Sequence, residues 1–274
     1  MGATSAGGDG YYLATGSAAE KRLALLDEVY GPGAARIIRS IDFPCSGRVV
    51  DLGCGTGNTV RWFAQEAGDA GEVTGVDFSA EQLSVARSRI ESDGYSSIRL
   101  VQGSIYETGL PRNAFDIVHC RFVLCHLLRP MDGVREMAAL ARPGGLVIAC
   151  DLDLDGIFSA PQTPAYERLR ALIHGRAAAK GSDSRLGLKL PRMFAEAGLG
   201  KPEVEIVHPI YLRGERKRLW EHTLFEASAY MIEQGLCDQA ELDRLAQELA
   251  AIAADESIAV AQAAMPVVWA RKPS

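Results

Sequence analysis

Three glycines at alternate positions, Gly53, Gly55 and Gly57, follow an apolar run that contains Asp51. Glycine lacks a Cβ atom, so such a run reaches positive φ without strain and lets a ligand lie close to the backbone. A second apolar run ends in another carboxylate, Asp77, about twenty residues beyond the glycines. An acidic side chain at about that distance accepts hydrogen bonds from ribose in nucleotide-binding folds. The pattern predicts a site for a nucleoside-containing cofactor.

The spacing of the glycines distinguishes between the possible nucleotide ligands. A dinucleotide fold uses G-x-G-x-x-G, with the third glycine opening a helix over a pyrophosphate, whereas Asn58 occupies that third position here. Asp51 would repel a pyrophosphate but would attract a ligand with a positively charged group. A phosphate-binding P-loop is excluded because no Gly-Lys-Ser/Thr follows the glycines. A cationic nucleoside therefore fits this loop better than NAD does.

The segment from Asp51 to Gly57 resembles the first motif, D/E-x-G-x-G-x-G, of the class I S-adenosylmethionine-dependent methyltransferases. The resemblance covers most of residues 11–208. It implies that S-adenosyl-L-methionine is the cofactor and S-adenosyl-L-homocysteine the product. It also implies that the glycine loop lies beside the methionine part of the cofactor and that Asp77 holds the ribose. The residues expected to bind the cofactor are Tyr12, Asp51, Gly53, Gly55, Gly57, Asp77, Phe78, Gln82, Ser104, Ile105 and Cys120.

Several of these roles come from matching the family position by position. Phe78 matches an apolar residue that packs on the adenine ring. Ser104 stands where the family commonly has an aspartate that accepts from the adenine amino group, and a hydroxyl is a weaker acceptor. The backbone amide of Ile105 is then the expected contact to the ring. The segment 115–122, which includes Cys120, is expected to give backbone contacts to the methionine end.

The candidate general base is His126, because imidazole titrates near neutral pH. The alternative is a structural role, in which His126 packs beneath the sheet end and binds a backbone carbonyl. The residues expected to contact the substrate are Tyr11, Arg121 and Asp153. The sequence does not decide whether the other histidines of the second half reach the site: His174, His208 and His222.

We expect no metal ion. Asp151, Asp153 and Asp155 alternate as metal ligands do, but an EF-hand loop starting at Asp151 would need glutamate at its twelfth position, where Gln162 stands. The six cysteines form no Cys-x-x-Cys pair and no zinc spacing. We therefore expect Asp153 to face the substrate rather than a metal ion.

Composition limits the partners. There are 29 Lys and Arg against 35 Asp and Glu, so the formal net charge is −6. Nucleic-acid enzymes usually carry a basic stripe, and the one basic cluster here is the short segment 213–218. No apolar run approaches the roughly 18 residues of a membrane span, and the N-terminus lacks the apolar core of a signal peptide. We expect a cytoplasmic protein with a small-molecule substrate and neither a nucleic acid nor a membrane as partner.

The alternation of apolar and polar residues predicts the elements. The expected strands are 48–52, 73–77, 97–101, 115–119, 145–150, 203–208 and 265–271. The expected helices are 17–30, 34–41, 58–67, 79–92, 131–141, 163–180, 187–197 and a stretch over 215–256 interrupted near Gly235. Strands separated by helices form parallel βαβ units. The predicted fold class is α/β, a doubly wound, mostly parallel seven-stranded sheet with helical lids from both ends of the chain.

The same pattern predicts how the chain is divided. The expected parts are a disordered tail (1–10), an N-terminal helical lid (11–44), an α/β core that binds the cofactor (45–210), a helical insertion (211–258) and the final strand of the core (259–274). Helical insertions of this size are compatible with a homodimer.

The functional expectation is methyl transfer to a hydroxyl or an amine of a small metabolite, in specialised biosynthesis. The reaction would be an in-line displacement at the sulfonium methyl, which the cofactor already activates. Alignment of the partners alone contributes on the order of 7–11 kcal/mol to such a reaction. The alternative is a protein of the same fold that uses the cofactor for cyclisation or regulation.

Overall fold

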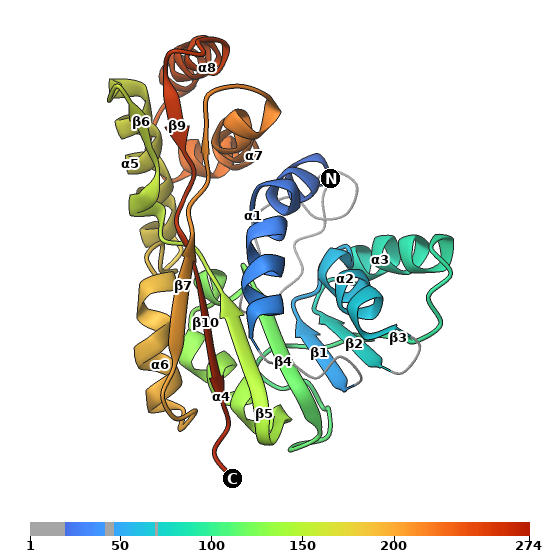
Figure 1. Cartoon of the computed structure of the whole chain (residues 1–274). Helices are drawn as coiled ribbons and strands as arrows, with labels where there is room; N and C mark the ends of the chain where they lie inside the picture. The colour runs from blue at the N-terminus through green and yellow to red at the C-terminus, as the bar shows by residue number, and fades with distance from the viewer. Residues whose placement is uncertain (1–19, 42–46, 69–70) are drawn as a thin grey trace.

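The computed structural model describes residues 20–41, 47–68 and 71–274. At its centre is a seven-stranded sheet with the order β3-β2-β1-β4-β5-β10-β7 (Figure 1). Its strands are β1 (Arg48–Leu52), β2 (Glu72–Asp77), β3 (Ile98–Gln102), β4 (Phe115–Arg121), β5 (Ala141–Cys150), β7 (Glu203–Val207) and β10 (Met265–Arg271). The first five are parallel to one another, and β10 runs antiparallel between β5 and β7. The predicted α/β class with a mostly parallel seven-stranded sheet is confirmed.

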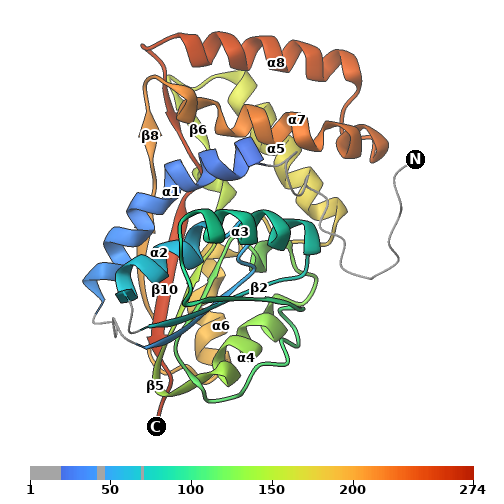
Figure 2. The ribbon, with the colours of Figure 1, turned by 90° about the vertical axis from the view of Figure 1, so that its right-hand side faces the viewer.

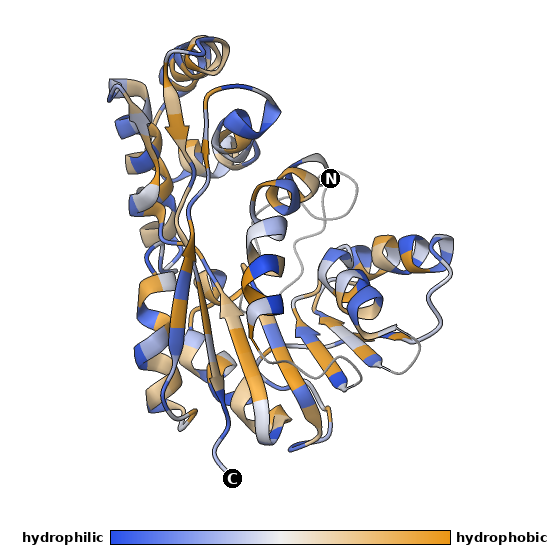
Figure 3. Ribbon diagram, viewed as in Figure 1, coloured by the Kyte–Doolittle hydropathy of each residue, from blue (hydrophilic) through white to orange (hydrophobic). Residues whose placement is uncertain are grey.

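Helices cover both faces of this sheet because successive residues of its central strands are buried. Figure 3 shows hydrophobic residues along these strands. Val49 of β1 packs into one buried cluster with helices that precede and follow it, and the next residue, Val50, packs into the cluster on the opposite face. The first face carries α1 (Glu20–Ser40), α2 (Asn58–Ala67) and α3 (Ala80–Ser92). The second carries α4 (Pro130–Leu140) and α6 (Leu190–Glu196) (Figures 1 and 2).

A third buried cluster builds a separate layer beyond the ends of the parallel strands (Figures 1 and 2). It contains α5 (Pro164–Ala179), α7 (Leu219–Glu233) and α8 (Gln239–Ala254), together with a small sheet of order β6-β9-β8. The strands of this small sheet are β6 (Phe158–Ala160), β8 (Ile210–Tyr211) and β9 (Ala259–Ala261). We call this layer the helical cap.

The strand order places a topological switch point between β1 and β4. The chain leaves β1 toward β2 and β3 on one side, then returns to the other side for β4 and β5. In open α/β sheets, ligands bind at such a point, beyond the carboxyl ends of the strands. The glycine loop follows β1 at this point, and Asp77 ends β2 beside it.

The N-terminal region differs from the expectation of two helices. α1 is one helix that runs through Pro32. Proline usually breaks a helix interior, but buried residues before and after it, such as Val29 and Ile37, belong to the same apolar cluster. Packing on the sheet therefore outweighs the local preference. The expected N-cap of the first helix, Ser17, lies outside the described residues.

The second half also departs from the expected division. α5 packs with α7 and α8 in the helical cap rather than with the core, because its stripe of Leu169, Leu172 and Ile173 faces those helices. Residues 259–261 form β9 of the small sheet, so only β10 of the final segment belongs to the main sheet. Among the described helices, none is both long and apolar enough to cross a membrane.

Candidate active site

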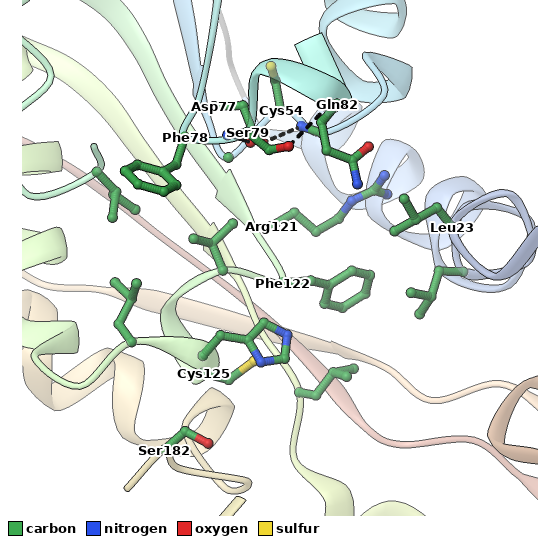
Figure 4. A pocket seen from close by; sticks show the side chains of 18 of the residues that line it. Leu23, Cys54, Asp77, Phe78, Ser79, Gln82, Arg121, Phe122, Cys125 and Ser182 are labelled. Carbon is green, nitrogen blue, oxygen red and sulfur yellow. Dashed lines mark hydrogen bonds between the residues drawn. The ribbon is translucent and has the colours of Figure 1, made fainter. Parts of the chain in front are cut away.

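A cavity of about 630 Å³ lies at the carboxyl ends of β1, β2 and β4, and the helical cap lines its other side. Its volume falls in the range of roughly 300–1,000 Å³ that small-molecule sites occupy. The loop end of the cavity is formed by the glycine loop and by Asp77 and Phe78. The cap end is formed by side chains from α1, α5 and α7: Arg22, Arg176, Trp220 and Thr223. Figure 4 shows labelled side chains around this space.

The glycine loop has the backbone that the sequence predicted. Gly53, Gly55 and Gly57 have φ of 75°, 53° and 86°, which an L side chain rarely adopts. A Cβ at Gly53 would lie 2.2 Å from Cγ2 of Val123, whereas a Cβ at Gly55 would meet nothing within 4 Å. Gly53 and Gly55 line the cavity. Gly57 does not: it caps the start of α2 and allows that helix to pack closely on Ala86 of α3.

The Asp77 carboxylate is fixed by the backbone around it. Its Oδ2 accepts from the amide of Gly55 and its Oδ1 from the amide of Ser79, both at 2.8 Å. Burial raises the pKa of Asp77 above its usual value, and these two amides, which stabilise the charged form, oppose that rise. A carboxylate has about four acceptor positions. Acceptor capacity therefore remains for hydroxyls of a ligand in the cavity.

Apolar and polar groups lie side by side near Asp77. Phe78 is 70% exposed and its ring projects into the space in Figure 4. Gln82 is buried, and its Oε1 has no hydrogen-bond partner among the described residues. Ser104 and Ile105 line the same part of the cavity. The Ser104 hydroxyl accepts from the amide of Tyr106 at 3.2 Å, so part of its capacity is used within its own turn.

Asp51 of β1 also lines the cavity, and its side chain is held by His119 of the neighbouring strand β4. Its Oδ1 lies 2.7 Å from Nδ1 of His119, and both side chains are almost fully buried. The His119 ring also contacts the edge of Phe63 and lies 3.8 Å from Sγ of Cys150. The register that pairs Asp51 with His119 on β4 brings these groups together. His119 thus fixes the direction in which Asp51 presents its carboxylate.

His126 lines the cavity at the end of a short 3₁₀ turn, Leu124–His126. Burial, together with the positive charges of Arg176, Lys180 and Arg22, lowers its pKa to about 3. The imidazole is therefore neutral at physiological pH, with a nitrogen lone pair free of a proton. It is a weak base, however, because efficient general bases have a pKa near the working pH.

The structure brings most, but not all, of the expected residues to one place. Arg121 lines the cavity, and its Nη2 donates to Oδ1 of Asp27 on α1 at 2.6 Å. Cys120 and Asp153 do not line it. Cys120 is buried in the core on the other face, and Asp153 Oδ1 accepts from the amide of Asp155 within a tight turn. Tyr11 and Tyr12 lie outside the described residues.

Sequence reasoning did not assign the residues of the cap end a role at the site. Arg176 lies on α5 at the spacing of Leu169, Leu172 and Ile173, so it occupies the buried stripe of an otherwise apolar face. A cation at such a position is a recognisable sequence signal. Trp220 and Thr223 give no comparable signal, because their pattern is that of ordinary core residues. The other histidines, His174, His208 and His222, do not line the cavity.

Comparison with known proteins gives the class. Residues 50–149 match the family described as "Methyltransferase domain". A demethylmenaquinone methyltransferase of Bacillus licheniformis is 31% identical over an alignment that covers 60% of this chain and 75% of the relative. The chain therefore belongs to the class I S-adenosylmethionine-dependent methyltransferases. This membership supports methyl transfer over the alternative of cyclisation or regulation.

Solved structures agree with the fold. A Bacillus halodurans protein assigned as a methyltransferase covers 88% of this chain and 99% of its own, with a TM-score of 0.60 and 20% identity. Phosphoethanolamine N-methyltransferase 2 of Haemonchus contortus, in complex with phosphomonomethylethanolamine and S-adenosylhomocysteine, covers 97% of this chain and 55% of its own, with a TM-score of 0.55 and 17% identity. At these identities the likeness establishes the architecture alone.

Proposed function

We propose that this methyltransferase transfers the methyl group of S-adenosylmethionine to a hydroxyl or an amine of a small metabolite. The observation that carries the proposal is one continuous cavity, which joins the glycine loop and Asp77 at one end to the side chains of the cap end at the other. A space of this kind would allow a bound cofactor and an acceptor to contact each other.

The cofactor would lie at the loop end. Asp77 would accept hydrogen bonds from the ribose hydroxyls through its remaining acceptor capacity. The ring of Phe78 would stack on the adenine, and Oε1 of Gln82, which lacks a partner among the described residues, would accept from a nucleoside donor. The open side of Gly55 leaves room for the methionine part, whose positive charges Asp51 would attract.

The reaction would be an in-line displacement. The acceptor oxygen or nitrogen forms a bond to the methyl carbon as the bond from that carbon to sulfur breaks. The electron pair returns to sulfur, which becomes the neutral thioether of S-adenosylhomocysteine. A hydroxyl acceptor becomes strongly acidic once it carries the methyl group, so even the weakly basic imidazole of His126 would accept its proton. The main contribution of the protein would be alignment.

A second candidate acceptor is a quinone of the kind named for the relatives. The observation that favours it is the 31% identity to a demethylmenaquinone methyltransferase. The apolar side chains that line the cavity are compatible with a ring system in the acceptor position: Leu23, Leu26, Phe122, Leu127, Leu152 and Leu154.

The net charge of −6 supports a small-molecule acceptor rather than a nucleic acid.

The test uses cofactor with a deuterated methyl group and a panel of phenols, primary amines and reduced naphthoquinones, with products read by mass spectrometry. A labelled methyl on oxygen or nitrogen would support the first proposal. A labelled methyl on a naphthoquinone ring would support the second candidate instead. Tight cofactor binding with no labelled product from any of these acceptors would contradict both.

A further inference from the structure

The cap end of the cavity contains buried hydrogen-bond donors that lack acceptors. Arg22 of α1 is 4% exposed and donates through Nε to Oε2 of Glu226 at 2.7 Å. Its Nη2 is buried and has no partner among the described residues. Trp220 of α7 is 3% exposed, and its Nε1 is likewise buried without a hydrogen-bond partner among the described residues. A buried donor without an acceptor is costly unless a ligand supplies one.

These two donors belong to one surface. The Arg22–Glu226 pair joins α1 to α7, the helix that carries Trp220, and both donor residues line the cavity. Thr223 lies one turn after Trp220 on the same side of α7 and lines it as well. The two unpaired groups are N–H donors. A ligand that satisfies them must therefore present acceptor atoms.

Arg176 adds charge to this surface. It is 7% exposed, lines the cavity from α5, and its guanidinium stays protonated under all ordinary conditions. Glu226 offsets the charge of Arg22. The charge of Arg176 is felt nearby, because it helps burial to lower the pKa of Lys180 to about 8 and that of His126 to about 3. At His126, which lines the same cavity, these neighbouring charges are all positive: Arg176, Lys180 and Arg22.

We propose that the cap end binds an anionic oxygen, a carboxylate or a phenolate, carried by an otherwise apolar acceptor. Arg176 and Arg22 would hold the oxygen, with the indole N–H of Trp220 as a further donor. Such a charge-assisted contact is stronger than one between neutral groups. This inference rests on the proposed function in one respect, namely that the methyl acceptor occupies the cap end. It restricts the acceptor to a molecule with an acidic group.

The test compares matched probes by calorimetric titration into the full chain saturated with S-adenosylhomocysteine. 2-Naphthoate and 2-naphthamide have the same shape but differ in charge, and they form the carboxylate arm. 4-Nitrophenol, ionised at mildly alkaline pH, and 4-nitroanisole form the phenolate arm. We expect at least one charged probe to bind about tenfold or more tightly than its neutral partner, as for a hydrogen bond to a charged group. The arm that shows the preference identifies the source of the oxygen.

Two variants locate the site. Arg176→Gln removes the charge and Trp220→Phe removes the indole donor, and each should lower the affinity for the charged probe while leaving that for the neutral probe nearly unchanged. Retained affinity for S-adenosylhomocysteine shows that each variant is folded. Arg192→Gln is the matched control, because Arg192 is exposed on α6 and pairs only with Glu196 in its own helix among the described contacts. It should keep the full preference.

Equal affinity for charged and neutral probes in both arms would overturn the inference, as would a preference that survives Arg176→Gln. The outcome is separable from that of the proposed function, because probe binding needs no turnover. A clear preference together with no methyl transfer to any acceptor would uphold the anion site and reject the transfer proposal. Transfer to neutral acceptors without any preference would do the reverse.

Discussion

Asp77 is the residue on which the cofactor assignment depends most. Its two oxygens are already oriented by the amides of Gly55 and Ser79, so the free acceptor positions point in fixed directions. Orientation of this kind reduces the cost of binding, because the side chain does not have to be ordered by the ligand.

Replacing Asp77 with alanine should lower the affinity for S-adenosylhomocysteine by about 1–3 kcal/mol, or roughly 5- to 150-fold. The loss arises because the ribose hydroxyls would lack their acceptor. Calorimetric titration measures it. The control is Asp116→Ala, which removes a carboxylate bonded to Arg142 at the opposite end of the sheet and should leave the affinity unchanged. Unchanged affinity in a folded Asp77→Ala variant would remove the ribose assignment.

His126 should make stability depend on pH. Its pKa is about 3 in the folded protein against an ordinary value of 6.5, so between these values the unfolded chain binds the proton and the folded one does not. Its contribution to stability is therefore lost progressively as pH falls below 6.5. Near pH 5 the loss should be about 2 kcal/mol.

Urea unfolding of wild type and His126→Gln over pH 5–7 checks this prediction. The difference in unfolding free energy between them should shift in favour of the variant as pH falls. The comparison also cancels the opposite contribution of Asp151, whose pKa burial raises to about 6. Parallel curves for the two proteins would mean that the imidazole titrates normally in the folded state.

At the scale of elements, the regular parts of the fold were predictable because their periodicity is strong. The helix 58–67 and the strands 48–52 and 265–271 match α2, β1 and β10 to the residue. β6, β8 and β9 were missed because two or three residues are too few to show an alternation, and their pairing joins distant segments. The glycine loop was recognisable for the same reason as the strands: its function requires particular residue types at fixed spacing.

The cap end was not predictable in the same way. Arg22, Arg176 and Trp220 come from three helices that are far apart in the sequence, and only the packing of α1 and α5 against α7 brings them to one cavity. Cys120 was assigned to the cofactor on the basis of its segment. The side chain faces the second core cluster, since alternate residues of a strand point to opposite faces.

The packing of α1 on the edge of the sheet depends on Gly33. A Cβ at this position would lie 2.5 Å from Cγ1 of Val207 on β7. Alanine improves helix propensity by about 1 kcal/mol, but overpacking against a stiff β-branched side chain costs about 1–3 kcal/mol. We therefore expect Gly33→Ala to lower the free energy of unfolding by about 1 kcal/mol.

The double variant Gly33→Ala, Val207→Ala measures the clash directly in a double-mutant cycle. In this background the Gly33→Ala change should become neutral or stabilising, since the obstructing methyl groups are gone and the propensity gain remains. If Gly33→Ala is equally destabilising with and without Val207, the contact is not its cause.

At the scale of the whole molecule, α1 connects the two layers that enclose the cavity. It packs on the sheet through its apolar stripe and reaches the helical cap through the Arg22–Glu226 pair (Figure 2). The side chains of Arg22 and Glu226 are 4% and 18% exposed, so the ion pair is largely shielded from solvent. Removing either partner would leave the other charge poorly solvated. The position of the helical cap over the site thus depends partly on one ionic contact.

Breaking that contact should destabilise the protein. Glu226→Ala would leave the buried guanidinium of Arg22 without its carboxylate, at a cost of about 3 kcal/mol in the free energy of unfolding. Chemical denaturation measures the change. The exposed pair Arg192–Glu196 supplies the control, because Glu196→Ala should cost less than about 0.5 kcal/mol. Similar effects of the two substitutions would show that the inter-layer pair contributes no more than a surface one.

The most direct test of the central claim is a calorimetric titration of the purified chain with S-adenosylmethionine, S-adenosylhomocysteine and NAD. A class I methyltransferase with this loop should bind both sulfur nucleosides and should not bind NAD, since Asp51 opposes a pyrophosphate. Binding of NAD alone, or of none of the three, would contradict the account.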